Sequence, residues 1–481
     1  MLIKIENGES VLDALRRSGV SVAAPCGGNG TCGKCIVKIS GETCLACKTF
    51  PKGGSIEVTV ETQGEISVLS AYEDMGTVEC DRYDSARAYG IAIDLGTTTL
   101  AFELLDMRDG TRVAVFSRAN SQRVFGADVI TRISKAVEGE AEQLNATIIE
   151  DIRTGVKEIL RQSGITSGEI ACVAIAGNTT MLHLLRNLPC NTLGVHPFTP
   201  VTVEMYRCDF NEIFGLLNCE LIILPGISAF VGADIAAGIL FCGWPTAEEA
   251  SIFIDLGTNG EMALCCQGKI LATSTAAGPA FEAGNITHGV GSIPGAIAKV
   301  NYLPESNVFM YKTINNKPPV GICGTGVVDI TAELVRHRLV DETGLLENGV
   351  TSVNITADIG FVQKNIREVQ LAKSAVRSGI EILLGEAGLK YSDIGRVFLA
   401  GGFGYRIDVE NAAVLGLIPS GLKDKVLAVG NATLGGCAKV LLSRAGEEAL
   451  LNLVSIAEEV NLATHPRFNM LFMEYMSMEW P

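Results

Sequence analysis

Cysteines and glycines are concentrated near the start of the chain, in a pattern suited to binding a metal centre. Cys26, Cys32 and Cys35 are separated by short runs rich in glycine, and Cys47 follows in Leu45-Ala46-Cys47. Thiolates hold the iron of iron–sulfur clusters, and small residues between them let the backbone wrap the inorganic sulfur and direct amide groups toward it. The chemistry predicted for this segment is therefore thiolate ligation of a metal.

The stretch from Cys26 to Cys35 resembles the cluster-binding loop of 2Fe-2S ferredoxins. The residue types leave other readings open, since thiolates at such spacing also suit structural zinc, and cysteines can also be simply buried or disulfide-bonded. Cys44 competes with Cys47 as the fourth ligand. The same loop imitates a phosphate-binding loop and a dinucleotide fingerprint. However, the first needs Ser or Thr where Cys35 stands, and the second needs a preceding strand where residues 10–18 predict a helix.

Composition limits the class of protein and its partners. The 481 residues suffice for about two to four domains, and 47% hydrophobic content for sizeable cores. There is no cationic flank followed by an apolar run at the start, and no stretch of ~18 apolar residues, so we expect a cytoplasmic protein that does not bind membranes. The 15 cysteines then indicate reduced thiols and metal chemistry, as in an anaerobic cytosol. A net charge of −16 argues against nucleic acid as a partner.

The chain is predicted to consist of a small unit, a linker and a larger domain. Residues 1–61 combine a strand at 2–5, a helix from Ser10, the cysteine loop and an alternating strand at 55–61, which predicts a small α+β ferredoxin-like module of the β-grasp type. Residues 62–88 are polar with little periodicity and are interpreted as a flexible linker. Residues 89–481 form the larger domain.

An internal repeat indicates how the larger domain is built. The segment Ile91–Thr99 recurs as Ile252–Gly260, and each copy reads as an apolar strand ending in Asp, a Gly-Thr turn and a second strand. Two such hairpins far apart in the sequence predict a duplicated α/β unit with a cleft between the copies. A third element, Arg396–Gly404, is a strand that runs into a glycine turn.

These elements resemble the superfamily of acetate and sugar kinases, heat-shock chaperones and actin. Residues 94–98 resemble its first phosphate element, 176–180 its first connector, 255–259 its second phosphate element, 400–404 its adenosine element and 430–436 its second connector. The resemblance implies an actin-like ATPase domain with two lobes that binds ATP and Mg²⁺, because glycines expose backbone amides to phosphate oxygens and Asp holds Mg²⁺ through water. The catalytic residues it implies are Asp94 and Asp255. The nucleotide-binding residues it implies are Gly96, Thr97, Thr98, Gly257, Thr258, Asn259, Gly401, Gly402 and Gly404.

The combination of a ferredoxin module with this ATPase fold resembles the reductive activators of corrinoid proteins. The resemblance spans most of the chain, including Leu45-Ala46-Cys47 and Gly232-Ala233-Asp234. In that family the Leu-Ala-Cys cysteine is the fourth cluster ligand, which implies the set Cys26, Cys32, Cys35 and Cys47. The implied activity is ATP-dependent electron transfer from a 2Fe-2S cluster to reduce cob(II)alamin to cob(I)alamin. The implied partners are a corrinoid protein and a low-potential electron donor, and a homodimer is one option for the assembly.

Other functions share the same residues. Another ATP-coupled electron-transfer activator would use the same cluster and nucleotide elements. A small-molecule kinase with an accessory iron–sulfur cluster would phosphorylate a substrate without any redox partner. A redox-sensing ATP-binding protein would bind nucleotide without turnover. Asn178 and Glu261 are further candidates for placing the attacking water, and each is equally compatible with a structural role.

Overall fold

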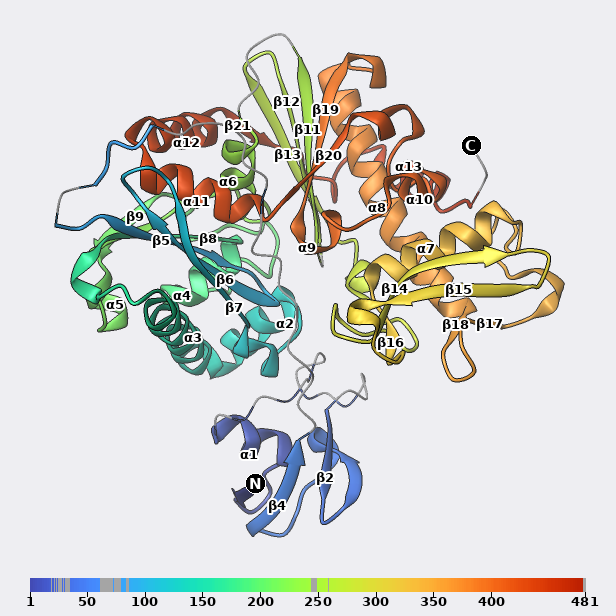
Figure 1. Ribbon diagram of the computed structural model, residues 1–481, viewed down its shortest axis with the longest axis horizontal. Coiled ribbons are helices and arrows are strands. Elements are labelled where there is room, and N and C mark those ends of the chain that lie inside the picture. Colours follow the sequence, from blue (N-terminus) through green and yellow to red (C-terminus); the bar gives the residue numbers. More distant parts are fainter. Residues whose placement is uncertain are drawn as a thin grey trace. The chain divides into compact units, whose positions relative to one another are not determined.

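The computed structural model describes residues 1–18, 20, 22, 24, 28, 30, 35–60, 72, 79–83, 86–243, 249–257 and 259–478 (Figure 1). Contacts between residues divide the chain into two units. Unit 1 consists of Met1–Gly64 and Tyr83–Leu224, and unit 2 of Glu65–Arg82 and Pro225–Pro481. No helix in the described part of the chain is long and apolar enough to cross a membrane.

The N-terminal module is a small sheet with one helix packed on it. Strands β1 (Leu2–Ile5), β2 (Ile36–Ile39), β3 (Glu42–Leu45) and β4 (Gly54–Val60) lie in the order β1-β4-β2-β3. Helix α1 (Val11–Arg17) starts at Ser10, whose hydroxyl accepts a hydrogen bond from Asp13 N at 3.1 Å. Val11, Leu12, Leu15 and Val58 are buried between helix and sheet. The predicted α+β ferredoxin-like module is confirmed.

Unit 1 also contains the first of two similar sheets. Its strand order is β7-β6-β5-β8-β10-β9. These strands are β5 (Tyr89–Leu95), β6 (Thr99–Asp106), β7 (Arg112–Ala119), β8 (Ile170–Gly177), β9 (Tyr206–Asp209) and β10 (Glu220–Ile223). The helices of this part are α2 (Val129–Lys135), α3 (Ala141–Ser163), α4 (Thr179–Leu185) and α5 (Phe210–Phe214).

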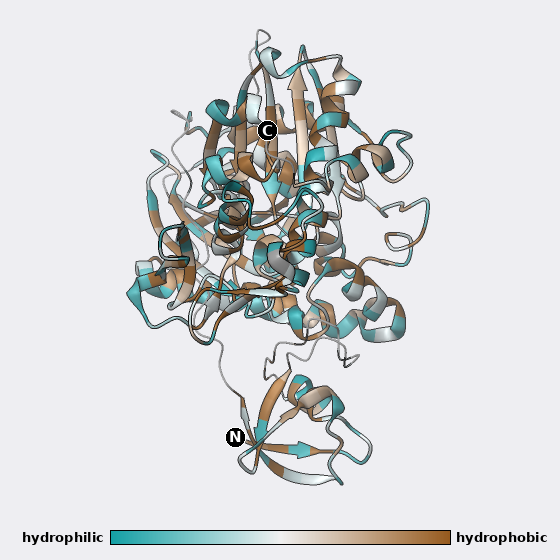
Figure 2. Ribbon diagram, turned by 90° about the vertical axis from the view of Figure 1, so that its right-hand side faces the viewer, coloured by the Kyte–Doolittle hydropathy of each residue, from teal (hydrophilic) through white to brown (hydrophobic). Residues whose placement is uncertain are grey.

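The second sheet, in unit 2, has the order β20-β19-β11-β12-β13-β21. Its strands are β11 (Ala250–Leu256), β12 (Gly260–Cys266), β13 (Lys269–Thr275), β19 (Ile394–Ala400), β20 (Val426–Gly430) and β21 (Ala457–Glu459). On one side lie α6 (Ala233–Phe241), α11 (Ala432–Leu442) and α12 (Arg444–Ile456), and on the other α8 (Gln363–Ala387), α10 (Val409–Val414) and α13 (Phe468–Glu474) (Figure 1). Its central strands are covered on both faces and are largely brown in Figure 2.

Five strands of each sheet share one topology, which confirms the predicted duplication. In each, a central strand pairs antiparallel with the next strand of a three-strand meander and parallel with a later strand: β5 with β6 and β8, β11 with β12 and β19. The chain then continues through a further parallel strand, β10 or β20, into α6 or α11. The two halves therefore correspond in these five strands, whereas β9, beside β10, and β21, beside β13, are additional strands at opposite edges.

This correspondence corrects the interpretation of residues 176–180 as the first connector. Those residues join β8 to α4, so their equivalent in the second half is the β19–α9 turn, where α9 is Gly401–Gly404. The equivalent of the second connector, β20–α11, is the passage from β10 to α6. A strand followed by Gly-Asn or Gly-Gly fits both positions, so the local motif did not distinguish them.

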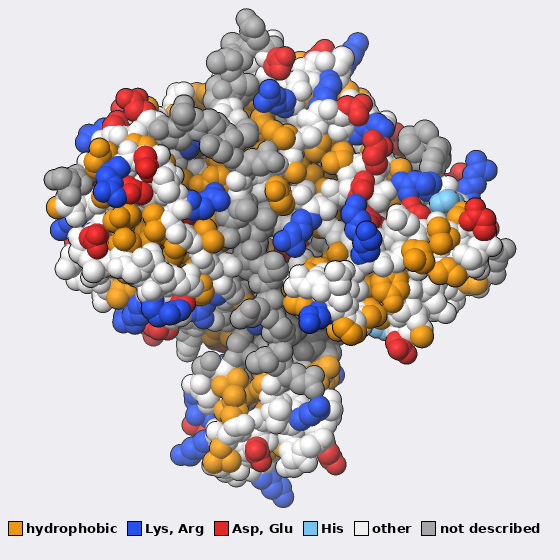
Figure 3. All heavy atoms as spheres, in the orientation of Figure 1, with side chains coloured by type: hydrophobic (Ala, Val, Ile, Leu, Met, Phe, Trp, Pro, Cys, Tyr) orange, Lys and Arg blue, Asp and Glu red, His pale blue; other side chains and the backbone are white. Residues whose placement is uncertain are grey.

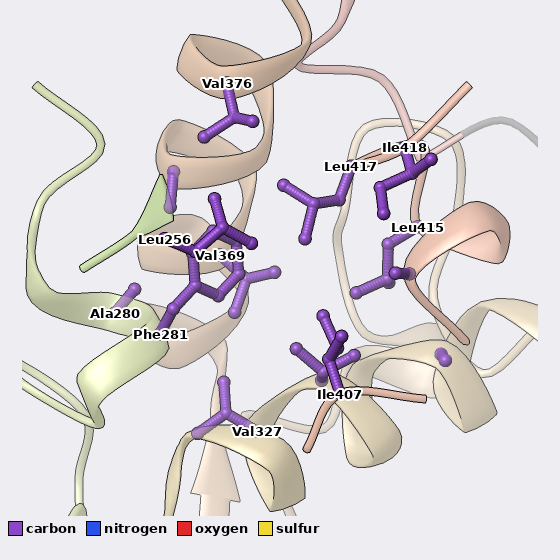
Figure 4. Close-up of a cluster of buried hydrophobic side chains, with 14 of the residues drawn as sticks. Leu256, Ala280, Phe281, Val327, Val369, Val376, Ile407, Leu415, Leu417 and Ile418 are labelled. Carbon is purple, nitrogen blue, oxygen red and sulfur yellow. The ribbon is translucent and has the colours of Figure 1, made fainter. Parts of the chain in front are cut away.

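An additional lobe of unit 2 lies between β13 and β19. It contains β14 (Ala296–Leu303), β15 (Val308–Thr313), β16 (Gly321–Ile322), α7 (Gly324–Arg336), β17 (Ser352–Asn354) and β18 (Gly360–Val362). Val308 and Met310 on β15 are exposed, and Figure 3 shows hydrophobic side chains on this lobe among charged ones. Its buried side joins a large hydrophobic core that includes Leu256, Phe281, Val327 and Val369 (Figure 4). That core fixes the end of β11 against α7 and α8.

The predicted linker makes contacts where it is described. Residues 62–71, 73–78, 84 and 85 lie outside the described residues. Tyr72 forms a β-bridge with Gly430, and its ring lies edge-on to Phe241 at 5.0 Å. Asp81 N donates to Leu442 O at 3.0 Å, and Arg82 forms an ion pair with Glu447. The segment is therefore attached to α11 and α12 at several points.

The close packing of α6 on α11 can be tested with a single methyl group. A Cβ on Gly436 would lie 2.1 Å from Ala237 O, whereas one on Gly385 in α8 would meet only the end of Arg467, Nη1 at 2.9 Å. We expect Gly436→Ala to lower the free energy of unfolding by about 1–3 kcal/mol. Gly385→Ala should be neutral or stabilising by up to ~1 kcal/mol, because alanine favours a helix. Urea unfolding followed by circular dichroism measures both, and a Gly436→Ala variant as stable as the parent would contradict the packing.

Candidate functional site

Two of the cysteines converge in the interior of the N-terminal module. Cys35 Sγ lies 3.3 Å from Cys47 Sγ, and Cys47 N donates to Cys35 Sγ at 3.4 Å. A disulfide bond is ~2.05 Å long, so the sulfurs are not bonded to each other. Two thiolates on one tetrahedral metal at ~2.3 Å would lie about 3.8 Å apart, and amide donors to sulfur are a regular feature of iron–sulfur sites. This donor set fits a cluster, whose other implied ligands, Cys26 and Cys32, lie outside the described residues.

Cys44 has a different environment from Cys47. It is half-buried, pairs with Val37 in the β2–β3 ladder and packs against the hydrophobic core of the module, to which Cys35 and Cys47 belong. Cys47 instead lies in the 3₁₀ turn η1 (Ala46–Lys48), next to Lys48. A Cβ on Gly30 would lie 2.4 Å from Lys48 Cε, so Gly30 lies close to the Lys48 side chain. The geometry favours Cys47, whose role as a ligand stays a prediction.

The first phosphate element forms a tight turn between β5 and β6. Asp94 lies near the end of β5, opposite Ala101 on β6 and Ala176 on β8, and is half-buried. A Cβ on Gly96 would lie 2.6 Å from Thr99 O, so glycine is required for this turn to close. Residues 96–98 are half-buried, and backbone amides of such a turn can donate to an anion.

Polar side chains fix the conformation of this turn by hydrogen bonds to residues 96–98. Asn120 Nδ2 donates to Gly96 O at 2.8 Å, and Asn120 N donates to Thr98 O at 2.9 Å. Arg132 Nη2 donates to Thr97 O at 2.6 Å, and Asn178 Nδ2 donates to Thr97 Oγ1 at 2.9 Å. Burial lowers the pKa of Arg132 to about 9. Asn178 also caps α4 by accepting from Met181 N, so the structure assigns it a structural role.

The second phosphate element places a carboxylate against a backbone turn. Asp255 on β11 lies opposite Glu261 on β12 and Ala400 on β19. Gly401, with φ +84°, follows Ala400, and a Cβ there would lie 2.5 Å from Asp255 Oδ1. The phosphate and adenosine elements of unit 2 are therefore in direct contact. Gly257 and Asn259 form the adjoining turn, with Gly257 N donating to Asn259 O at 3.0 Å, while Thr258 lies outside the described residues.

Further acidic side chains gather near Asp255. Burial and the neighbouring carboxylates of Asp234 and Asp255 raise the pKa of Glu261 well above its usual range. Burial raises the pKa of Asp234, in the first turn of α6, to about 6. Burial is the main cause of both raised pKa values, and a bound cation would favour the charged form of these carboxyl groups.

Two other glycine-rich turns meet the adenosine element. The Phe281 ring stacks on Phe403 at 5.2 Å with an interplanar angle of 11°. A Cβ on Gly324 would lie 1.8 Å from Phe281 O and 3.0 Å from Phe403 Cδ2. The turns at 275–282 and 323–326, which the sequence left undecided, thus pack beside Gly402 and Gly404.

Comparison with known proteins shows which family this chain belongs to. Matching family models are the 2Fe-2S iron–sulfur cluster binding domain (residues 2–55), the RACo middle region (89–246) and the C-terminal ASKHA domain of RACo (249–480). The corrinoid activation enzyme RamQ of Eubacterium limosum is 34% identical over 411 residues, which cover 79% of this chain and 68% of that protein. The chain belongs to the reductive activators of corrinoid proteins.

Other members of this family agree in sequence and structure. The [Co(II) methylated amine-specific corrinoid protein] reductase of Methanosarcina barkeri is 28% identical, over 80% of this chain and 76% of that one. The solved structure of a reductive activator for corrinoid, iron-sulfur protein superposes with a TM-score of 0.73 and 25% identity, over 98% of this chain and 96% of that one. The activator therefore joins a 2Fe-2S domain to an ASKHA domain, the actin-like ATPase fold, as predicted.

The choice between Cys47 and Cys44 can be tested directly in this activator. We expect Cys47→Ala to lose the normal 2Fe-2S absorption and most of the iron, because it removes the thiol beside Cys35. Cys44→Ala removes a half-buried thiol of the same size and should keep both. Iron and sulfide analysis of anaerobically purified protein distinguishes the two, and the opposite pattern would reassign the ligand.

The contact between Gly401 and Asp255 predicts a selective loss of nucleotide binding. We expect Gly401→Ala to lower ATP affinity at least tenfold, because the new methyl group would displace the carboxylate or the turn. Gly388→Ala is the matched control: Gly388 also has positive φ, +65°, but its Cβ would meet nothing within 4 Å. Calorimetric titration with ATP measures both variants, and equal affinities would show that the contact does not matter for binding.

Proposed function

We propose that this activator takes one electron at a time from a low-potential donor and passes it to a corrinoid protein, reducing cob(II)alamin to cob(I)alamin with the help of ATP. One observation carries the proposal: the chain combines two converging buried thiols in a ferredoxin fold with a duplicated ATPase fold that contains two Asp-Leu-Gly-Thr segments. The names of its relatives point to the same partner.

A bound 2Fe-2S cluster would supply one-electron transfer. Cys35 and Cys47 would hold it, and their burial limits access of water. In the ATPase part, we propose that Asp94 and Asp255, each in its own unit, can hold hydrated Mg²⁺, and that the turn beside each of them can donate to phosphate oxygens. Glu261, directly across from Asp255, is the candidate for orienting the attacking water.

ATP has an energetic role in this scheme. Plant-type 2Fe-2S clusters have potentials near −400 mV, and the Co(II)/Co(I) couple is expected to be lower, so unaided transfer is unfavourable. A coupling of ~1–3 kcal/mol between nucleotide and partner would shift a one-electron equilibrium by roughly 40–130 mV. Nucleotide binding therefore helps, and a change of cobalt coordination in the complex would supply the remainder.

The function is tested by mixing anaerobic activator, reductant and a candidate cob(II)alamin protein and following the visible spectrum. We expect cob(I)alamin to form with Mg²⁺-ATP and not without it. Asp255→Ala should keep the cluster spectrum but lose Mg²⁺-dependent ATP hydrolysis and activation. Asp358→Ala, in an exposed turn, should behave like the parent. Phosphorylation of a small molecule with no change at cobalt would instead support the kinase reading.

A further inference from the structure

An arginine joins the ferredoxin module to the rest of unit 1. Arg16, in the last turn of α1, donates from Nη2 to Val124 O, and its guanidinium carbon lies 5.6 Å from the centroid of the Phe125 ring. Its Nη1 also donates to Asp13 Oδ1 at 3.2 Å. Only 11% of the Arg16 side chain is exposed. A largely buried arginine that bonds a carbonyl on another element is a specific contact.

The same arginine lies beside the cysteine loop. A Cβ on Gly28 would lie 3.2 Å from Leu12 Cδ2 and 3.8 Å from Arg16 Nη2. Gly28 stands between Cys26 and Cys32 in the sequence, within the loop that the family uses for the cluster. A change in the loop's charge or position would therefore reach the guanidinium group.

On its other side, Arg16 contacts the segment that supports the first phosphate turn. Val124 ends the 3₁₀ turn η2 (Ser121–Val124), and Asn120 directly precedes it. Asn120, Gln122 and Arg132 are fully buried. Gln122 N donates to Asn120 Oδ1 at 2.9 Å, and Arg132 Nη1 donates to Gln122 Oε1 at 3.3 Å. As described above, Asn120 and Arg132 bond the backbone of residues 96–98, so rigid contacts run from this turn to Val124.

We propose that Arg16 is a positioning residue through which nucleotide at the first phosphate turn and the redox state of the cluster affect each other. The inference rests on the proposed function for both ligands. Arg16 links the position of the module to that of Val124 by one charge-assisted hydrogen bond to Val124 O and one cation–π contact with the Phe125 ring. Phosphate binding at residues 96–98 and a change of charge near Gly28 act on opposite ends of the same contacts.

Reciprocity makes the proposal quantitative. If cluster reduction changes nucleotide affinity by some factor, nucleotide must change the equilibrium constant for reducing the cluster by the same factor. For one electron, a tenfold change in affinity equals ~59 mV. Removing the Arg16 contact should abolish both effects together, while each ligand still binds.

The test uses the full-length holoprotein and Mg²⁺ with a non-hydrolysable ATP analogue. Its dissociation constant is measured with the cluster oxidised and dithionite-reduced, and the midpoint potential with and without it. We expect at least a fivefold affinity ratio in the parent and a ratio near one in Arg16→Ala. Arg17→Ala is the matched control, because Arg17 bonds Glu9 and Lys4 O within the module, and it should keep the parent ratio. Arg16→Lys should restore part of it.

The outcomes separate this inference from the proposed function. An unchanged ratio in Arg16→Ala with full iron content, or a ratio of one in the parent with both ligands bound, overturns the role of Arg16. Absence of a cluster or of analogue binding in the parent overturns the proposed function instead. If Arg16→Ala loses its cluster, the test uses Phe125→Leu instead, because Phe125 lies outside the module. An affinity ratio well below the parent's then supports the proposal, and a ratio equal to the parent's refutes it.

Discussion

The nucleotide-binding part depends on how closely backbone can approach a carboxylate at the end of a buried strand. Asp255 stands where β11 leaves the sheet, and Gly401 brings the next turn so near that a methyl group would lie 2.5 Å from its oxygen. The same rule holds at Gly96, whose turn closes on Thr99 O. Acidic oxygens and exposed amides can share a small volume only where side chains are absent.

The same constraint accounts for the strand arrangement that both halves of the ATPase part share. A central parallel strand must be covered on both faces, so its end is a fixed point on a rigid support, and an adjoining meander brings a second strand beside it. Both halves use this arrangement, in β5-β6-β7 and β11-β12-β13. The iron–sulfur module follows different rules: its small core is built around thiols, with Cys35 and Cys47 among its buried residues.

The sequence predicted those features whose signal is local. The cysteine loop at 26–35 and each Asp-Leu-Gly-Thr hairpin turn lie within about ten residues, and the family resemblance that they carry predicted both folds. Residues 176–180 were wrongly interpreted as the first connector because a strand followed by a turn of small residues occurs twice in each half. Asn120 and Arg132 were missed because a single polar residue with distant partners leaves no pattern. Asp234 appeared in a family motif, but only packing brings it near Glu261.

The attachment of residues 81 and 82 to α11 and α12 has a consequence for synthesis of the chain. Arg82 contacts Val440 and Glu447, partners 358 and 365 residues later in the sequence. At ~5–20 residues per second, a ribosome needs roughly 20–70 s to make the intervening chain. During that interval the N-terminal module, whose strands pair with one another within residues 2–60, can fold and acquire its metal before residues 81 and 82 gain these partners. Cluster assembly would then precede completion of the ATPase part.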